Sequence, residues 1–466
     1  MATHFRVAIC FSRGTKFRQL KFGSNLFKGW WGCWGQSPQG LIYCIFMAKT
    51  VYFTVLCFGG NIMRKFIGNK AFYILVLSVA VPIMVQNGIT NFVNLLDNLM
   101  VGQIGTEQMS GVSIINHLIF VFNVCIFGAC SGAGIFCAQY YGTRDFDGIR
   151  YSFRFKLIAC IIMCAVATLL FKLKGDTLIS LFLNDAENPG QLALTLKYAR
   201  DYLDVIILIL VPHAIAQAYA STQRETGETV LPMIAGIAAV ITNLVFNYIL
   251  IFGKFGFPVM GVKGAALATF ISKLVEMGIC VGWTHLNKDK NPYAVGLYRS
   301  FKIAPYVAAQ ITKKGTPLIL NEILWSMGTA TLIQCYSIRG LNVVAGVNIA
   351  STVYNLFNLV FMALGSAVSI IVGQQLGAGE LDKAKDSAVK LIFFAVTSCS
   401  VVGLIIIALS GVFPDFYNTT DEVKEIARLL IIAIGIYMPI QAFNHTSYFT
   451  MRSGGQTIIT FLFDSV

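Results

Sequence analysis

The chain has 466 residues, of which 56% are hydrophobic and only 12% are charged, and its mean hydropathy is +0.69. Soluble domains carry about 25% charged residues, so this composition excludes an ordinary soluble protein and predicts that most of the chain lies in lipid. The net charge of +13 does not indicate nucleic-acid binding, because residues 1–62 hold seven Lys or Arg and no acidic residue and supply +7 of it.

Residues 1–62 differ in composition from the rest of the chain, since they hold four of the twelve Cys and three of the five Trp. We interpret this basic, Cys/Trp-rich stretch as an extension that is not native, with Met63 as the true start. Two alternatives stay open. Residues 41–59 are apolar and can form an extra helix, and a targeting segment is possible in principle, although no convincing small-residue cleavage site supports it.

Ten apolar stretches follow, each near the ~20 residues that a helix needs to cross a bilayer. They cover residues 71–96, 111–138, 155–173, 198–221, 230–252, 260–284, 315–337, 343–374, 389–412 and 426–450, and an eleventh begins near residue 456. Helices satisfy their own backbone hydrogen bonds in lipid, so the sequence predicts an all-α integral membrane protein. The alternating ~10-residue segments of a membrane β-barrel are absent.

The second half of the chain repeats the first. Residues 82–152 align with residues 317–387 at a constant offset of 235 without a gap, and about 13 of the 71 aligned positions are identical. Similarity between the halves of an apolar chain is typical of duplicated transporter folds.

A turn motif, R-x-x-G-x-T, closes the fourth and the tenth span, at residues 224–229 and 452–457. Its glycine suits a tight turn between helices. Two spans follow the first copy, whereas only nine residues follow the second. We therefore predict two parallel-related six-helix bundles, residues 63–300 and 301–466, with 12 spans when complete and the second bundle truncated in its eleventh helix.

Lys and Arg are concentrated on one side of the predicted spans. About 18 lie on the side where the first span starts, among them Arg154, Lys156 and Arg452, and about 9 lie on the other side. By the positive-inside rule, the amino terminus of the core is expected in the cytoplasm, in a multi-pass protein of the cell membrane.

An enzyme is not expected, because the chain has no P-loop, no nucleophile elbow and no Cys or His spacing of a metal site. No organic cofactor is expected either, and without a P-loop ATP is not the expected energy source. Ion-coupled movement of a solute remains. It needs ionisable groups at membrane depth, which are costly to place there and are functional candidates for that reason.

Asp97 lies late in the first span, where it can bind Na⁺ or a proton, or can lie in water at the outer interface. Asn243 and Asn247 share one helix face, so their carbonyls can join Asp97 around a cation, and interhelical hydrogen bonding is the alternative. Thr269 is a further ligand or a packing residue. Glu322, in the seventh span, is the acid expected to be most desolvated and is a candidate for cation coupling.

Prolines recur in corresponding spans of the two halves. Pro82 matches Pro317, and each permits a kink, either for bending during transport or as fixed packing. The glycine-rich residues 128–134 predict close helix packing. Asp464, in the truncated eleventh span, is a weaker candidate for a role like that of Glu322.

The ordered set of motifs resembles the MATE (multidrug and toxic compound extrusion) family of transporters, bacterial type, from about Met63 to Val466. The segments that carry the resemblance are 81–82, 94–102, 131–134, 139–142, the two R-x-x-G-x-T turns, 264–269 and 373–377.

This resemblance implies two bundles around a central cavity and export of organic, often cationic, compounds in exchange for H⁺ or Na⁺ by alternating access. It implies that Asp97 is the coupling-ion residue, with Asn243 as its partner, and that Pro82 bends its helix. Asn247 stands where the family often has Asp, which leaves the ion and its stoichiometry open. Glu322 resembles a family glutamate, but its distance from the preceding proline differs by about a turn.

Six residues of the predicted spans are candidates for lining the cavity, the aromatic ones by cation–π attraction: Phe122, Asn123, Gln139, Trp325, Phe357 and Asn358. No metal is expected beyond Na⁺ at Asp97. The expected partners are small organic substrates and the lipid bilayer, with no nucleic acid, and a monomer is expected. A lipid-linked oligosaccharide flippase of the same superfamily and an inactive membrane-protein fragment remain alternative functions.

Overall fold

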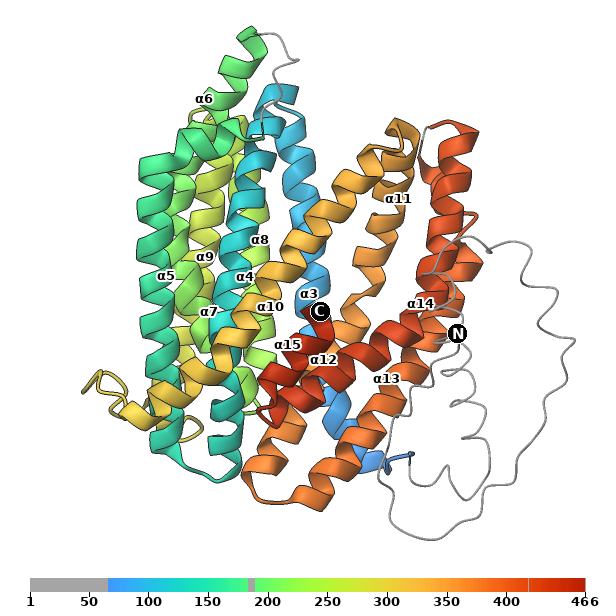
Figure 1. Cartoon of the computed structure of the whole chain (residues 1–466). Helices are drawn as coiled ribbons and strands as arrows, with labels where there is room; N and C mark the ends of the chain where they lie inside the picture. The colour runs from blue at the N-terminus through green and yellow to red at the C-terminus, as the bar shows by residue number, and fades with distance from the viewer. Residues whose placement is uncertain (1–65, 183–188, 418, 466) are drawn as a thin grey trace, which may run out of the picture. The chain divides into compact units, whose positions relative to one another are not determined.

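The computed structural model describes residues 66–182, 189–417 and 419–465, and the predicted extension, residues 1–62, lies outside them. Within these ranges every regular element is a helix, so the prediction of an all-α fold is confirmed (Figure 1).

Seven α-helices form the first half of the described chain. They are α3 (Lys70–Gly102), α4 (Thr106–Gly142), α5 (Phe146–Ser180), α6 (Pro189–Ile206), α7 (Leu210–Glu225), α8 (Val230–Phe252) and α9 (Gly261–Leu286). A single 3₁₀ turn, η2 (Ile207–Ile209), joins α6 to α7. The predicted fourth span is therefore broken. Pro212 explains the break, because it lacks the N–H that would continue α-helical bonding into this turn.

The second half has six α-helices and the short turns η3 (Pro292–Ala294) and η4 (Pro414–Phe416). The α-helices are α10 (Pro305–Ser337), α11 (Leu341–Phe357), α12 (Leu359–Gly377), α13 (Leu381–Leu409), α14 (Asp421–Ser453) and α15 (Thr457–Ser465). The predicted eighth span is α11 and α12, which meet at Asn358.

Nine segments among the described residues are long and apolar enough to cross a membrane. Nine of the ten predicted spans are matched in this way. The exception is α10, whose mean hydropathy is lowered by polar residues that include Asn321 and Glu322. The outer face of α5 shows what surrounds the protein: Ile162, Leu169 and Leu173 are 57%, 60% and 70% exposed along it. A continuous exposed apolar face of this kind is expected against lipid rather than water.

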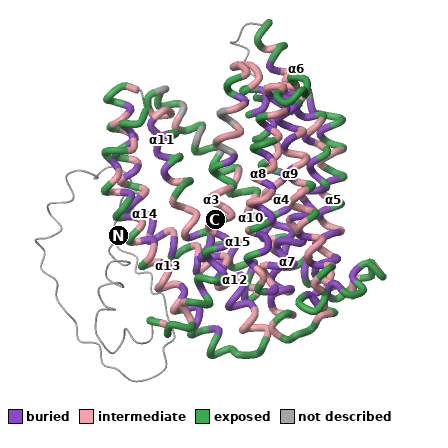
Figure 2. The backbone as a smooth tube through the Cα atoms, turned by 180° about the vertical axis from the view of Figure 1, so that it is seen from behind, coloured by how far each residue is buried: buried purple, intermediate pink, exposed green. Residues whose placement is uncertain are grey.

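The halves have separate hydrophobic cores, and α3 contributes to both. Val76 and Ile83 belong to the core of the second half, whereas Val101 belongs to the core of the first half. Pro82 thus lies near the place where α3 passes from one core to the other. In Figure 2 the buried stretches concentrate on helices such as α4, α7 and α12.

Helix α10, the counterpart of α3 in the repeat, likewise packs against helices of both halves. Val307 and Ile311 on α10 pack with Ala133 on α4. A Cβ added to Gly132 would lie 2.7 Å from the Cα of Gly315, so the two backbones touch, and the predicted close packing at residues 128–134 is confirmed. The contacts of the two helices correspond, since α3 packs on α8 and α12 while α10 packs on α15 and α4.

Candidate functional site

Four of the predicted residues meet where α3, α8 and α9 pack together. Asn247 donates a hydrogen bond from Nδ2 to Oδ1 of Asp97 at 2.6 Å, and from the same nitrogen to Oδ1 of Asn243 at 3.0 Å. Asn243 Nδ2 is 3.2 Å from the hydroxyl of Thr269 on α9. We call these four residues the Asp97 cluster.

The cluster is enclosed by protein. Asn243 and Asn247 are 4% and 1% exposed, and Asp97 is half-buried. With its amide turned by 180°, Asn243 donates to both carboxylate oxygens of Asp97, at 2.8 and 3.2 Å, and accepts from Thr269 at 3.2 Å. Both orientations hold the carboxylate by amide N–H groups, so the hydrogen bonds fix its position.

One acceptor of the Asp97 cluster is unused. Among the described residues, Oδ1 of Asn247 is buried and has no hydrogen-bond partner. Buried polar atoms are rarely left unpaired, because each costs free energy. Carboxylate, amide and hydroxyl oxygens are the ligands that hard cations prefer, and a carboxylate also takes up a proton. The cluster therefore has the chemistry to bind Na⁺ or H⁺.

The second half holds a different set of charges. Asn321 on α10 donates to Asp464 on α15 at 2.7 Å, and its Oδ1 accepts from Ser465. The neighbouring Glu322 is half-buried and lies within the electrostatic reach of Arg452 and Asp464. The two predicted acids of this half thus share one environment.

Arg452 is 3% exposed, and its guanidinium lies 5.1 Å from the ring centroid of Phe449. It lies in the last turn of α14, and its long side chain packs against aromatic rings.

The predicted bending and cavity residues lie in several environments. Pro82 and Pro317 both lie inside uninterrupted helices. Of the cavity candidates, Phe122 is buried in the core of the first half, Phe357 packs on the core of the second, and Trp325 is 54% exposed.

The polar cavity candidates are also dispersed. Oδ1 of Asn123 is buried and has no partner among the described residues. Asn358 lies at the junction of α11 and α12, and Gln139 bonds to the other half.

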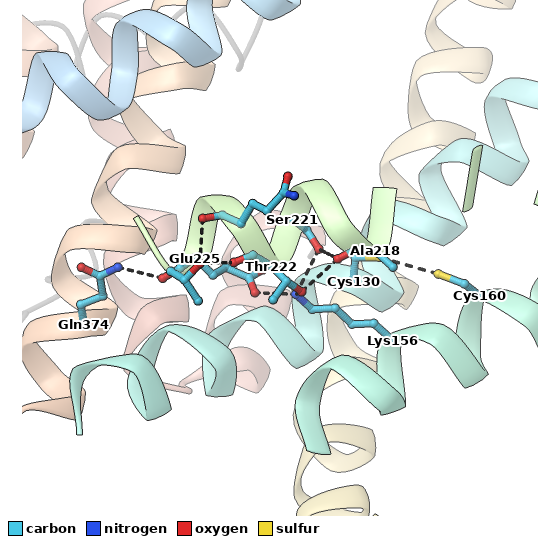
Figure 3. Close-up of polar contacts among 10 residues, drawn as sticks. Cys130, Lys156, Cys160, Ala218, Ser221, Thr222, Glu225 and Gln374 are labelled. Atoms are coloured by element: carbon cyan, nitrogen blue, oxygen red, sulfur yellow. Dashed lines mark hydrogen bonds and ion pairs between the residues drawn. The ribbon is translucent and has the colours of Figure 1, made fainter. Parts of the chain in front are cut away.

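A buried ion pair was not predicted from the sequence. Lys156 on α5 is fully buried and donates to Glu225 at 2.5 Å and to the hydroxyls of Ser221 and Thr222, each at 3.0 Å (Figure 3). Lys156 was expected among the basic residues of the cytoplasmic side, at the start of the predicted span 155–173. The signal that reveals it is a lysine ten residues, or nearly three turns, inside a helix that starts at Phe146.

Two hydrogen bonds join the halves of the molecule at one end. Gln374 Nε2 on α12 donates to the backbone carbonyl of Glu225 at 2.8 Å (Figure 3), and Gln139 Nε2 on α4 donates to the carbonyl of Ser453 at 2.8 Å. The two glutamines are identical partners in the internal repeat. That identity is the sequence signal for their shared role.

A pocket of about 330 Å³ lies at this same junction, between α3, α4 and α12. Ser78, Tyr141 and Gln374 are among its lining residues. Ser78 precedes Asp97 by 19 residues of α3, which corresponds to about 28 Å along a helix. The pocket and the Asp97 cluster are therefore separate places in the fold.

Apolar helices with lipid-facing surfaces, duplicated halves and buried charged groups define a multi-pass membrane transporter. The sequence profile of the MatE family matches residues 82–249 and 317–463. The chain therefore belongs to the MatE family.

Curated relatives match most of the chain. A protein of Thermotoga maritima named "Probable multidrug resistance protein NorM" is 27% identical over 396 residues, which cover 83% of this chain and 82% of the relative. "Probable multidrug resistance protein YoeA" of Bacillus subtilis is 25% identical over 390 residues, 81% of this chain and 80% of the relative.

Solved structures share the fold. A mutant of the Vibrio cholerae MATE transporter VcmN superposes with a TM-score of 0.76 at 15% identity, covering 85% of this chain and 86% of that one. A multidrug resistance MATE family transporter in its outward-facing conformation gives a TM-score of 0.75 at 18% identity, with 83% and 84% covered. At these identities the likeness establishes the fold alone.

Proposed function

We propose that this protein is a secondary active transporter that exports organic, often cationic, compounds in exchange for H⁺ or Na⁺. The observation that carries the proposal is the Asp97 cluster, in which a half-buried carboxylate is held by two buried amides. The names of the relatives, which describe multidrug resistance proteins, support the class of substrate.

The coupling ion is proposed to bind at Asp97. A carboxylate inside a helix bundle is costly while it is charged and unpaired, so a cation or a proton stabilises it. Asn243 and Thr269 position the oxygens around it, and the unused Oδ1 of Asn247 supplies another ligand. Binding of the ion and of the substrate then favour different conformations, which couples their movements.

The protein is proposed to lie in the cell membrane as a monomer, with the start of α3 on the cytoplasmic side. The excess of Lys and Arg on that side supports this orientation. The ends of α4, α7, α12 and α14 then face the cytoplasm.

Efflux from membrane vesicles tests the proposal. Ethidium efflux is measured with a Na⁺ gradient and a proton gradient imposed separately, for the parent protein, Asp97→Asn and Asp176→Asn. Asp176 is a matched control, because its side chain is 68% exposed in a surface ion pair. We expect one gradient to drive efflux by the parent and by Asp176→Asn but not by Asp97→Asn. Equal efflux by Asp97→Asn at normal membrane levels contradicts the proposed role of Asp97.

A further inference from the structure

Two hydrogen bonds connect the halves of the molecule at the end where α4, α7, α12 and α14 finish. The two bonds correspond to each other in the internal repeat. Each R-x-x-G-x-T turn presents one backbone carbonyl, and the glutamine of the opposite half donates to it. We call Gln139, Gln374 and the carbonyls of Glu225 and Ser453 the glutamine latch.

The two turns have the same backbone hydrogen bonds. In the first, the N–H groups of residues 226, 227 and 228 bond to the carbonyls of residues 222, 224 and 223. In the second, residues 454, 455 and 456 bond to residues 450, 452 and 451. Gly227 and Gly455 make these turns possible with φ of +88° and +73°. Both patterns leave the same carbonyl, Glu225 or Ser453, for a donor from elsewhere, as expected at a helix C-terminus.

The helices that carry the glutamines touch backbone to backbone. A Cβ added to Gly142 on α4 would overlap the carbonyl oxygen of Gln374, and a Cβ added to Gly377 on α12 would overlap the carbonyl oxygen of Gln139. A Cβ added to Gly373 would lie 3.1 Å from the Cβ of Ala138. The contact between α4 and α12 therefore leaves no space for a side chain at either Gly142 or Gly377.

The halves differ in how they hold the carbonyl that accepts. Glu225 is anchored through its side chain by the buried amine of Lys156 (Figure 3), whereas Ser453 is 1% exposed and donates to the carbonyl of Thr450 at 2.8 Å. Both anchors keep the accepting residue fixed relative to its own half. The latch therefore connects a fixed part of each half to the other half.

We propose that the glutamine latch closes the transporter at this end and must separate in every transport cycle. This inference rests on the proposed function, because alternating access requires the halves to part at each end in turn. Gln139 and Gln374 are positioning residues: they set the equilibrium between closed and open conformations without touching the transported solute.

A reversible cross-link tests the need for separation. In Ala138→Cys with Gly373→Cys the two Cβ atoms start 3.1 Å apart, so a small separation of α4 and α12 brings them to the distance in a disulfide, about 3.8 Å. A protease site inserted at the exposed Asp289, between α9 and α10, lets gel electrophoresis show whether the halves are covalently joined. We expect oxidation of the double Cys variant to stop efflux and a reductant to restore it. In either single Cys variant the oxidant should leave the efflux rate unchanged. Efflux at the parent rate by fully cross-linked protein overturns the proposal.

A labelling experiment tests the hydrogen bonds without any transported substrate. Ala138 is 3% exposed, so the thiol introduced by Ala138→Cys reacts with a maleimide only when the contact opens. Loss of both hydrogen bonds in Gln139→Leu with Gln374→Leu predicts roughly tenfold faster labelling. Gln375→Leu is the matched control, because Gln375 lies beside the latch residue on α12 and bonds to no carbonyl of the other half in the described contacts.

The two proposals fail in distinguishable ways. Absence of efflux from every variant, the parent included, removes the proposed function, while the labelling rates still test the latch. Labelling of the double Leu variant at the rate of the Gln375→Leu control overturns the latch, whatever the efflux result.

Discussion

Lys156→Leu offers a direct test of how the first half is held together. The amine is fully buried and makes three hydrogen bonds, one of them the ion pair with Glu225, whose side chain is only 13% exposed. Removing one partner of a buried ion pair leaves the other charge without compensation and typically costs about 3–5 kcal/mol. We expect the single variant to lose stability by that amount.

The chain contains its own control for this experiment. At the positions equivalent to Lys156 and Glu225, the second half has Leu391 and Ser453, both 1% exposed. The double variant Lys156→Leu with Glu225→Ser copies that arrangement and removes both charges of this buried pair, so most of the lost stability should return. Replacing a buried pair by apolar residues is often neutral.

Thermal unfolding of the purified proteins in one detergent measures the effect. The parent and the double variant should have similar apparent melting temperatures. That of Lys156→Leu should be well below both. The reasoning is refuted if Lys156→Leu unfolds at the temperature of the parent, or if the double variant is no more stable than the single one.

Three further outcomes follow from the geometry. Asn247→Ala removes the charge-assisted hydrogen bond to the carboxylate on α3 and should slow efflux by about tenfold or more at equal membrane levels; an unchanged rate contradicts its role. Gly377→Ala adds a Cβ that overlaps the carbonyl of Gln139 and should prevent the disulfide between Cys at positions 138 and 373. Gly190→Ala adds a Cβ that meets nothing within 4 Å and should leave that disulfide intact. Arg154→Lys loses a guanidinium that bonds to three carbonyls of the loop before α10, so limited proteolysis there should accelerate; equal cleavage rates count against this.

The Asp97 cluster could be predicted because its components are readable from the sequence. A four-residue spacing places Asn243 and Asn247 on one face of a helix, and an acid in an apolar stretch is conspicuous. The resemblance to a known family supplied Asn243 as the partner of Asp97, and the structure added the hydrogen bond from Asn247, since periodicity alone does not identify which helices are neighbours.

The contacts between the halves could not be predicted in that way. Helices that are apolar on most faces give little periodicity from which to read their neighbours. Gln139 and Gln374 were visible as repeated residues, but their acceptors are backbone carbonyls, which every residue has. Lys156 was counted with the basic residues of the cytoplasmic side, and its pairing could not be foreseen because its partner, Glu225, lies 69 residues further along the chain. Such pairs depend on the tertiary packing of α5 against α7.

Ion movement driven by substrate tests the central claim most directly. Purified protein in liposomes receives an ethidium gradient, and the movement of protons and of Na⁺ in the opposite direction is recorded for the parent and for Asp97→Asn. The account predicts that one of the two ions moves with the parent and that neither moves with Asp97→Asn. Ethidium transport by the parent without movement of either ion, or the same ion flux through Asp97→Asn, would contradict it.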